Sequence, residues 1–488
     1  MEKLKQINLN KWIGYILLAL YVVSAIGFVY YCTTLNMFPG KYIVIMAIVF
    51  AILAVLIMIM HERILTSIIA SILTIVLIVG CILGSHYIIR TSQTMKDVST
   101  SDVQTDIVSV YVMEDDPAEV LEDVRDYTIG IVNEPNEKNA KKTIESLEAE
   151  LGGKLNTKSS DSMFTMMDEL KAGTVQAILL NDAYAGIVAD VEKYDWVATD
   201  LRKITEVAHV IDVENEDSVP EAVPETFIMY LSGIDTYGGV SARSRSDVNI
   251  LAVINTKTKN ILLLSTPRDS YVEFNETGGA KDKLTHAGIY GVEASMNALE
   301  CLYDVQVDYY LRINFSGFVD IIDALGGIDV NSEYEFTVDP IKTYTVGVNH
   351  LTGLEALAFA RERYSFADGD YQRAKNQMEV IRAVIQKCAS SSLLKNYGTV
   401  MNAVAGSFET NMPQEQIAAL VKMQLSDMAQ WTVSSYTTGG TSMYAETFSM
   451  PGQELYVIEL DPAAVEEAKQ LIQEVFATST EMASSNKG

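Results

Sequence analysis

Three apolar segments near the start of the chain constrain its fold more than any other feature. They cover Trp12–Tyr31, Tyr42–Met60 and Ile64–Ser85, and none of them contains Asp, Glu, Lys or Arg. Each is long enough to cross a hydrocarbon core of about 30 Å as a helix. A removable signal peptide has one short apolar core before a small-residue cleavage site, which does not fit three consecutive spans. The sequence therefore predicts a membrane anchor of three retained helices over residues 1–90.

The positive charges that flank these segments predict the orientation of the anchor. Lys3, Lys5 and Lys11 precede the first segment, whereas the connection to the second carries only Lys41. Cytoplasmic flanks of membrane spans are enriched in Lys and Arg, so we expect the N-terminus to be cytoplasmic. Three spans then place residues 86–488 outside the cell. The predicted location is the cell membrane, with multiple spans and a large extracellular part.

The part of the chain that follows the anchor is strongly acidic. Residues 1–96 carry seven Lys or Arg and two Glu, a balance of +5, so the remaining residues carry −33 when the whole chain carries −28. A surface of this charge repels a phosphate backbone, and we expect no nucleic-acid partner. Four cysteines without a Cys-x-x-Cys pair exclude a disulfide-rich scaffold, and the sequence leaves open whether Cys301 and Cys388 pair.

Beyond the anchor the pattern predicts two α/β units. Residues 91–106 are polar and rich in Ser and Thr, which is typical of a linker. Over 107–215, short β-rich runs alternate with helical patterns, predicting a small accessory α/β domain. No motif in that domain suggests chemistry, so we expect it to act as a spacer or as a contact surface for a partner. An acidic, proline-containing linker is expected at 216–225.

The second unit is expected to cover residues 226–477, with a disordered tail at 478–488. Strand patterns at Phe227–Leu231, Val248–Ile254 and Ile261–Leu264 are interspersed with helical patterns, which indicates an α/β fold. Charged residues stand at the ends of these strands. Asp235 follows the first, Arg245 and Asp247 precede the second, and Arg268 and Asp269 follow the third. Ligands bind at strand ends in open α/β sheets, so we expect a site there.

A second group of polar residues follows about a hundred positions later. Arg361 and Arg363 lie two apart after a helical pattern, and residues at that spacing face one way only in extended chain, so the helix is expected to end near residue 360. Asp370, Arg373 and Gln377 are spaced three and four apart and therefore share one face of the next helix. This face is suited to a ligand.

The two groups together predict an anion site with a divalent cation. Arginine grips phosphate oxygens with a planar fork of charge-assisted bonds. The candidate cations for this role are Arg245, Arg268, Lys283, Arg361, Arg363 and Arg373. Asp235 and Asp247 are candidate ligands for Mg²⁺, with Mn²⁺ as the alternative, because Mg²⁺ takes one or two carboxylates and completes its shell with phosphate and water. Such a set suits phosphoryl transfer, although a set of surface salt bridges is the alternative.

Other catalytic classes lack their residues in this sequence. Outside residues 1–90 the only histidines are His209, His286 and His350. The chain has no His-Glu-x-x-His helix, no Gly-x-Ser-x-Gly elbow and no Gly-Lys-Ser/Thr phosphate loop. These absences disfavour zinc proteolysis, serine hydrolysis and nucleotide binding.

The motifs of the second unit resemble those of the LytR-CpsA-Psr (LCP) family. The resemblance is carried, in shared order and spacing, by Ser232–Asp235, Arg245–Asp247, Ser265–Asp269, Lys283–Tyr290, Asn314–Phe318, Leu325–Asp329, Gly353–Arg363 and Gly369–Gln377. It implies a catalytic α/β domain with a central mixed sheet flanked by helices, in a membrane-anchored extracellular enzyme of Gram-positive bacteria. It also implies that the enzyme transfers a glycopolymer from a polyprenyl-pyrophosphate carrier to a peptidoglycan acceptor, with Mg²⁺ assisting.

The resemblance further implies a role for each matching residue. Asp235 and Asp247 would bind magnesium. The pyrophosphate would be held by Arg245, Arg268, Arg361, Arg363, Arg373 and Gln377. Asp269 and Asp370 would orient these arginines, and one of the two would serve as base. The residues expected to be catalytic are Asp247, Arg268, Asp269, Arg363 and Asp370.

The architecture adds an expectation about the polymer. A three-span anchor followed by an extra α/β domain is most similar to the capsule-attaching branch of the family, which implies a capsular polysaccharide and capsule-assembly proteins as partners. Wall teichoic acid is the alternative polymer. Two other functions stay open on the sequence, a module that binds the lipid-linked polymer without turning it over and a phosphatase that cleaves the pyrophosphate.

Overall fold

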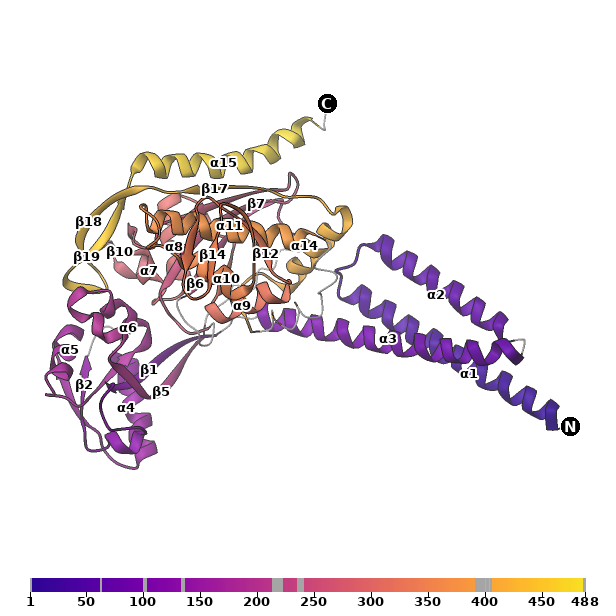
Figure 1. Ribbon diagram of the computed structural model, residues 1–488, viewed down its shortest axis with the longest axis horizontal. Helices are drawn as coiled ribbons and strands as arrows, with labels where there is room; N and C mark the ends of the chain where they lie inside the picture. The colour runs from indigo at the N-terminus through magenta and orange to yellow at the C-terminus, as the bar shows by residue number, and fades with distance from the viewer. Residues whose placement is uncertain are drawn as a thin grey trace.

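The anchor consists of three long helices that extend away from the rest of the protein (Figure 1). The computed structural model describes residues 2–61, 64–99, 103–132, 137–212, 223–234, 241–390, 400, 403 and 406–485. The helices are α1 (Glu2–Thr34), α2 (Gly40–Met60) and α3 (Ile64–Ser99). Their stretches Trp12–Thr34, Gly40–Met60 and Thr66–Met95 are long and apolar enough to cross a membrane. The anchor predicted from the sequence is therefore supported, and its orientation stays a prediction.

The third anchor helix is longer than predicted. α3 continues to Ser99, through most of the expected linker at 91–106, and strand β1 (Val103–Met113) begins soon after it. The last turns pack against α14 (Gln414–Asp427), where Met95 lies in a cluster with Ala418 and Gln414 Nε2 donates to Ser92 Oγ at 3.1 Å. The linker prediction was wrong here because tertiary contacts override the low helix propensity of a Ser/Thr-rich segment.

The accessory domain is built on a five-stranded sheet of order β3-β2-β4-β1-β5. After β1, its strands are β2 (Thr128–Val132), β3 (Asn156–Ser160), β4 (Ala177–Asn181) and β5 (Leu201–Asp212), and its helices are α4 (Glu137–Leu151), α5 (Met163–Lys171) and α6 (Asp182–Ala189). Two short 3₁₀ turns, Leu121–Val124 and Glu192–Ala198, complete it. β4 is buried along its whole length, which explains its continuous apolar sequence. Most of the linker expected at 216–225 lies outside the described residues.

The second domain contains a six-stranded mixed sheet of order β16-β11-β6-β7-β8-β17. These strands are β6 (Thr226–Ile234), β7 (Ser246–Asn255), β8 (Asn260–Ser265), β11 (Tyr309–Ile313), β16 (Phe408–Thr410) and β17 (Thr432–Thr437). β7 runs antiparallel to β6 and β8, whereas β11 is parallel to β6 and β17 is parallel to β8. The predicted α/β fold with a mixed sheet is confirmed.

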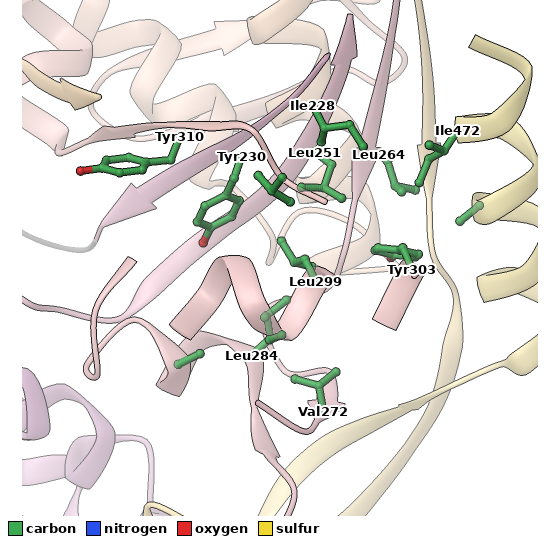
Figure 2. Close-up of a cluster of buried hydrophobic side chains, with 14 of the residues drawn as sticks. Ile228, Tyr230, Leu251, Leu264, Val272, Leu284, Leu299, Tyr303, Tyr310 and Ile472 are labelled. Carbon is green, nitrogen blue, oxygen red and sulfur yellow. The ribbon is translucent and has the colours of Figure 1, made fainter. Parts of the chain in front are cut away.

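Helices cover both faces of this sheet. On one face, α7 (Leu284–Ala287), α8 (Val292–Tyr303) and α15 (Pro462–Ser485) pack over Tyr230, Leu251 and Leu264 (Figure 2). On the other, α11 (Asp370–Ala389) packs Met378 against Ile250 and Leu263, and α9 (Phe315–Ala324) and α10 (Gly353–Arg361) pack beside it. α15 continues past residue 477 into the expected tail, of which 486–488 lie outside the described residues.

Short strands and one long hairpin surround this core. They are β9 (Tyr271–Val272), β10 (Asp282–Lys283), β12 (Ile328–Ser332), β13 (Phe336–Val338), β14 (Lys342–Tyr344), β15 (Gly347–Leu351), β18 (Gly440–Thr447) and β19 (Met450–Leu460), with a 3₁₀ turn at Asn275–Thr277. The β18–β19 hairpin reaches toward the accessory domain (Figure 1). Cys301 and Cys388 are both free, so the disulfide left open by the sequence is not formed.

Gly353 at the start of α10 permits a close approach between two helices. A Cβ at this position would lie 2.3 Å from the carbonyl oxygen of Val319 in α9, which only a backbone shift could relieve. We expect Gly353→Ala to lower the free energy of unfolding by about 1–3 kcal/mol. Denaturant unfolding of the full chain in detergent measures this. Gly153→Ala is the matched control, since its Cβ would meet only Arg125 Nη1 at 3.8 Å; an equal loss in both variants would contradict the steric argument.

Candidate active site

The register of the mixed sheet brings its charged strand ends to one edge. Ile234 at the end of β6 pairs with Ser246 at the start of β7, and Thr437 at the end of β17 pairs with Ser265 at the end of β8. β11 ends at the same edge, because Ile313 pairs with Gly233. The residues next to these ends therefore meet, as the sequence predicts for an open α/β sheet.

Arg268 is the centre of the resulting cluster. It follows β8, and its Nη1 lies 3.1 Å from Asp247 Oδ1 in β7. Its Nε lies 3.6 Å from Asp269 Oδ2 and 3.9 Å from Asp370 Oδ2 at the start of α11. The side chain is only 14% exposed, and Nε is buried without a hydrogen-bond partner. One guanidinium thus joins carboxylates from β7, the turn after β8 and α11, while a donor stays unsatisfied.

Further cations surround the same carboxylates. Arg373 Nη2 lies 3.0 Å from Asp370 Oδ2, and Arg363 Nη1 lies 3.7 Å from Asp370 Oδ1. Lys283 is buried, and its Nζ donates to Asp269 Oδ1 at 3.0 Å. The spacing of Asp370 and Arg373 on one helix face is confirmed, and the acid in the first turn of α11 is also favoured by the helix dipole.

The arginines of the cluster stabilise the ionised form of Asp247 and also affect one another. Burial by itself would raise the pKa of Asp247, but the charges of Arg268, Arg245 and Arg373 hold that pKa below its usual value. Burial lowers the pKa of Arg373, and the nearby charge of Arg268 adds to the effect against the opposing attraction of Asp370. Arginines whose charges repel one another in a partly buried site gain most when an anion arrives.

Two predicted residues lie differently from the rest. Arg361 is the last residue of α10, and its guanidinium stacks over the ring of Phe315 with its carbon 4.3 Å from the ring centre. Gln377 donates from Nε2 to the carbonyl of Ala360 at 3.4 Å, which ties α11 to α10. Asp235, the second predicted magnesium ligand, lies outside the described residues.

Arg245, another predicted pyrophosphate ligand, is held by the accessory domain. Its Nη1 lies 2.7 Å from Asp190 Oδ2 and donates to the carbonyl of Gly186 at 3.1 Å. No sequence pattern indicates this contact, because Asp190 lies in a domain without motifs. Thr285, which donates to Asp247 Oδ1 at 3.2 Å, was also missed, although it lies inside the Lys283–Tyr290 motif.

A bound metal ion would need ligands from the described residues or from the substrate. The described residues contain no group of three or more His, Cys, Asp or Glu side chains that could hold an ion. Asp247 nevertheless suits Mg²⁺, since both of the described contacts to its carboxylate fall on Oδ1. Mg²⁺ needs only one or two protein carboxylates when phosphate oxygens complete its shell. A site completed by the substrate therefore fits Asp247.

Comparison with known proteins assigns the chain to a family. The model of the LytR_cpsA_psr family matches residues 196–464, more than half of the chain. The chain belongs to this family. The family resemblance drawn from the motifs is thereby confirmed, and the match contains every described site residue except Gly186 and Asp190. As a member of the LCP family the protein is a transferase that attaches a glycopolymer to peptidoglycan.

Individual relatives show which members of the family the chain is similar to. The chain is 38% identical over 43% of its length to the polyisoprenyl-teichoic acid–peptidoglycan teichoic acid transferase TagU of Bacillus cereus, 68% of which is covered. It is 35% identical over 38% of its length to the TagU of Enterococcus faecalis, with 62% covered. The crystal structure of B. subtilis TagV is 27% identical, covering 51% of this chain and 97% of that one at a TM-score of 0.44. The names of these relatives give no support to the expected capsular polymer.

Proposed function

We propose that this LCP protein transfers a teichoic-acid-type glycopolymer from a polyprenyl-pyrophosphate carrier to a peptidoglycan hydroxyl. The observation that carries the proposal is the position of Arg268, buried among three carboxylates with an unsatisfied Nε and with Arg363 and Arg373 beside it. Several arginine forks around one point match the oxygens of a pyrophosphate. The identity to TagU proteins favours teichoic acid over capsule as the polymer.

The reaction follows from these side chains. The acceptor hydroxyl attacks the phosphorus that bears the sugar, a new P–O bond forms, and the bond from that phosphorus to the bridging oxygen breaks. Polyprenyl phosphate leaves with the bridging oxygen and its electron pair, and the polymer remains joined to peptidoglycan through a phosphodiester. Arg268, Arg363 and Arg373 neutralise the charge that develops on the phosphate oxygens, which is the main requirement of phosphoryl transfer.

The proton of the hydroxyl needs an acceptor. Asp370 is 32% exposed and can be reached by a hydroxyl, whereas Asp269 is 9% exposed and its Oδ1 is bound to Lys283. We therefore assign the base to Asp370 and the orientation of Arg268 and Lys283 to Asp269. Asp247, with Asp235 as its expected partner, would hold Mg²⁺, which when bound supplies further neutralisation of the pyrophosphate charge.

In this proposal the anchor determines on which side of the membrane the active site lies. Lys3, Lys5 and Lys11 lie in α1 just before the apolar span Trp12–Thr34 and favour a cytoplasmic N-terminus, so that three spans would bring the catalytic domain to the side of the cell wall. Both substrates are then within reach, since the polyprenyl chain lies in the same membrane and peptidoglycan lies outside it.

Removal of the metal tests the proposed role of Asp247. We expect chelation with EDTA and the substitution Asp247→Asn each to lower the transfer rate about a hundredfold, because each removes charge neutralisation at the pyrophosphate. The measurement is polymer release from a polyprenyl-pyrophosphate-linked teichoic acid, with peptidoglycan as acceptor and the full chain in detergent. Asp329→Asn, on an exposed pair with His350, is the matched control.

The products separate this function from its alternatives. A phosphodiester between polymer and peptidoglycan supports transfer. Free polymer phosphate with the same yield in the absence of peptidoglycan would instead indicate a phosphatase. An intact carrier after long incubation, with the protein still binding it, would indicate a module that binds without turnover.

A further inference from the structure

The C-terminal end of helix α6 in the accessory domain contacts a site arginine directly. Asp190 Oδ2 and the carbonyl of Gly186 both lie against Nη1 of Arg245, at 2.7 and 3.1 Å. The Arg245 side chain is 12% exposed and that of Asp190 is 33% exposed, so the guanidinium is largely shielded from solvent while the carboxylate stays partly accessible. The two accessory residues lie before the part of the chain that the family model matches.

The local structure of α6 suits a guanidinium. The helix ends at Ala189, and the amide of Asp190 donates to the carbonyl of Ile187 at 3.2 Å, so the Gly186 carbonyl does not receive that amide and instead accepts from Arg245. A Cβ on Gly186 would lie 2.9 Å from the central carbon of the Arg245 guanidinium. A helix C-terminus also favours a cation through its dipole. Glycine, carbonyl and carboxylate together form a cradle.

This cradle is fixed relative to the catalytic domain. The backbone of Thr105 in β1 pairs with the segment just before Arg245, through Thr105 N to Ser241 O at 3.0 Å and Arg243 N to Thr105 O at 2.9 Å. Ile187 of α6 lies in one buried cluster with Ile289 and Met450 of the catalytic domain. Figure 1 shows α6 close to the β18–β19 hairpin that carries Met450. The C-terminus of α6, which carries Asp190, is therefore held in place by the packing of Ile187.

We propose that the accessory domain supplies a positioning residue to the active site. Asp190, with the Gly186 carbonyl, fixes the rotation of the Arg245 guanidinium and so sets the plane in which its fork meets the pyrophosphate. The inference rests on the proposed function, because it assigns Arg245 to the same anion. If Asp190 competed with the anion for Arg245, its carboxylate would have to move away when the anion binds. Asp190 instead lies at the end of a packed helix, and the second acceptor for Arg245, the Gly186 carbonyl, belongs to the backbone.

The test is the affinity of the full chain in detergent for geranylgeranyl pyrophosphate, measured by calorimetric titration. We expect Asp190→Asn to weaken binding about tenfold, the lower end of the loss seen when the hydrogen-bonding partner of a metal-ligating side chain is removed. Gly186→Ala should weaken it similarly while the helix itself gains propensity, so unfolding cannot explain the loss. Asp190→Glu should recover part of the affinity. Asp182→Asn is the control, since Asp182 begins the same helix and pairs with Lys203 inside the accessory domain.

The Asp190→Asn substitution in an Arg245→Ala background tests whether Asp190 acts through Arg245. If Asp190 acts through Arg245, Asp190→Asn should cause no further loss in that background. An equal further loss would show a general structural effect and overturn the inference, as would tighter binding or unchanged binding in Asp190→Asn alone. Absence of binding by the wild type would instead contradict the proposed function, and the inference would fall with it.

Discussion

Replacing Arg268 by alanine should lower the rate of glycopolymer transfer by a factor of about 10²–10³ while the protein stays folded. The loss follows from removing the guanidinium nearest to three carboxylates at the sheet edge, where charge develops on the transferred phosphate. The fold should survive because Asp269 keeps Lys283 and Asp370 keeps Arg373, each at 3.0 Å. The measurement is the transfer assay with the lipid-linked polymer, together with thermal unfolding of the same sample.

Two further variants sharpen this prediction. Arg268→Lys retains the charge but not the planar fork, so it should recover only part of the rate. Arg382→Ala is the matched control, because Arg382 lies nine residues beyond Arg373 on α11, about 13 Å along the helix, and pairs with Glu379. Full transfer by Arg268→Ala, or an equal loss in Arg382→Ala, would contradict the assigned site.

Asp282→Ala should lower the free energy of unfolding by about 3–5 kcal/mol, the largest stability effect that we expect in the catalytic domain. Asp282 is fully buried, and its carboxylate accepts from Lys283 N at 2.7 Å, Ser449 N at 2.9 Å and the Ser449 hydroxyl. His286 Nδ1 lies 2.6 Å from it. Alanine would leave these buried donors without an acceptor. Denaturant unfolding of the full chain in detergent measures the change.

An exposed pair of the same kind is the control for Asp282. Asp329 and His350 are 2.7 Å apart, close to the 2.6 Å of Asp282 and His286, but their side chains are 66% and 60% exposed, so Asp329→Ala should change stability by less than about 1 kcal/mol. Similar losses in the two variants would contradict the role of burial.

The pH dependence gives an independent check on Asp282. Burial would raise its pKa, but His286 and the hydrogen bonds from Ser449 and Lys283 hold it below the usual 3.8. A depressed pKa contributes stability above the unfolded value, and that contribution is lost as pH falls through the folded value. The stability difference between the wild type and Asp282→Asn should therefore persist from pH 7 to about 4 and shrink at lower pH. A difference that is constant down to pH 2 would contradict this account.

Much of the site could be predicted because its residues stand at strand ends and at helical spacing. Asp247, Arg268 and Asp269 come together through the register of β7 and β8, and Asp370 and Arg373 through one turn of α11. The periodicity of the sequence and the order of its motifs are therefore enough to predict that these residues come together. Arg361 matches the same pattern, but as the last residue of α10 its guanidinium stacks on Phe315.

The contacts that could not be predicted join segments without a shared local pattern. Asp190 and Arg245 are 55 positions apart in two domains, and their pairing depends on how α6 packs against the catalytic domain. The continuation of α3 through a Ser/Thr-rich segment likewise depends on α14, more than three hundred residues later in the chain. In both cases tertiary packing determines the contact, and the pattern of a single sequence does not show that packing.

Native mass spectrometry can show whether the arginine cluster holds a polyprenyl pyrophosphate. The full chain would be released from detergent after expression with and without added polyprenyl-pyrophosphate synthesis, beside Arg268→Ala. We expect the wild type to carry an added mass equal to a polyprenyl phosphate or pyrophosphate, in an amount that increases with synthesis and is lost in the variant. A wild type free of lipid under both conditions, or a variant that retains as much lipid as the wild type, would contradict this expectation.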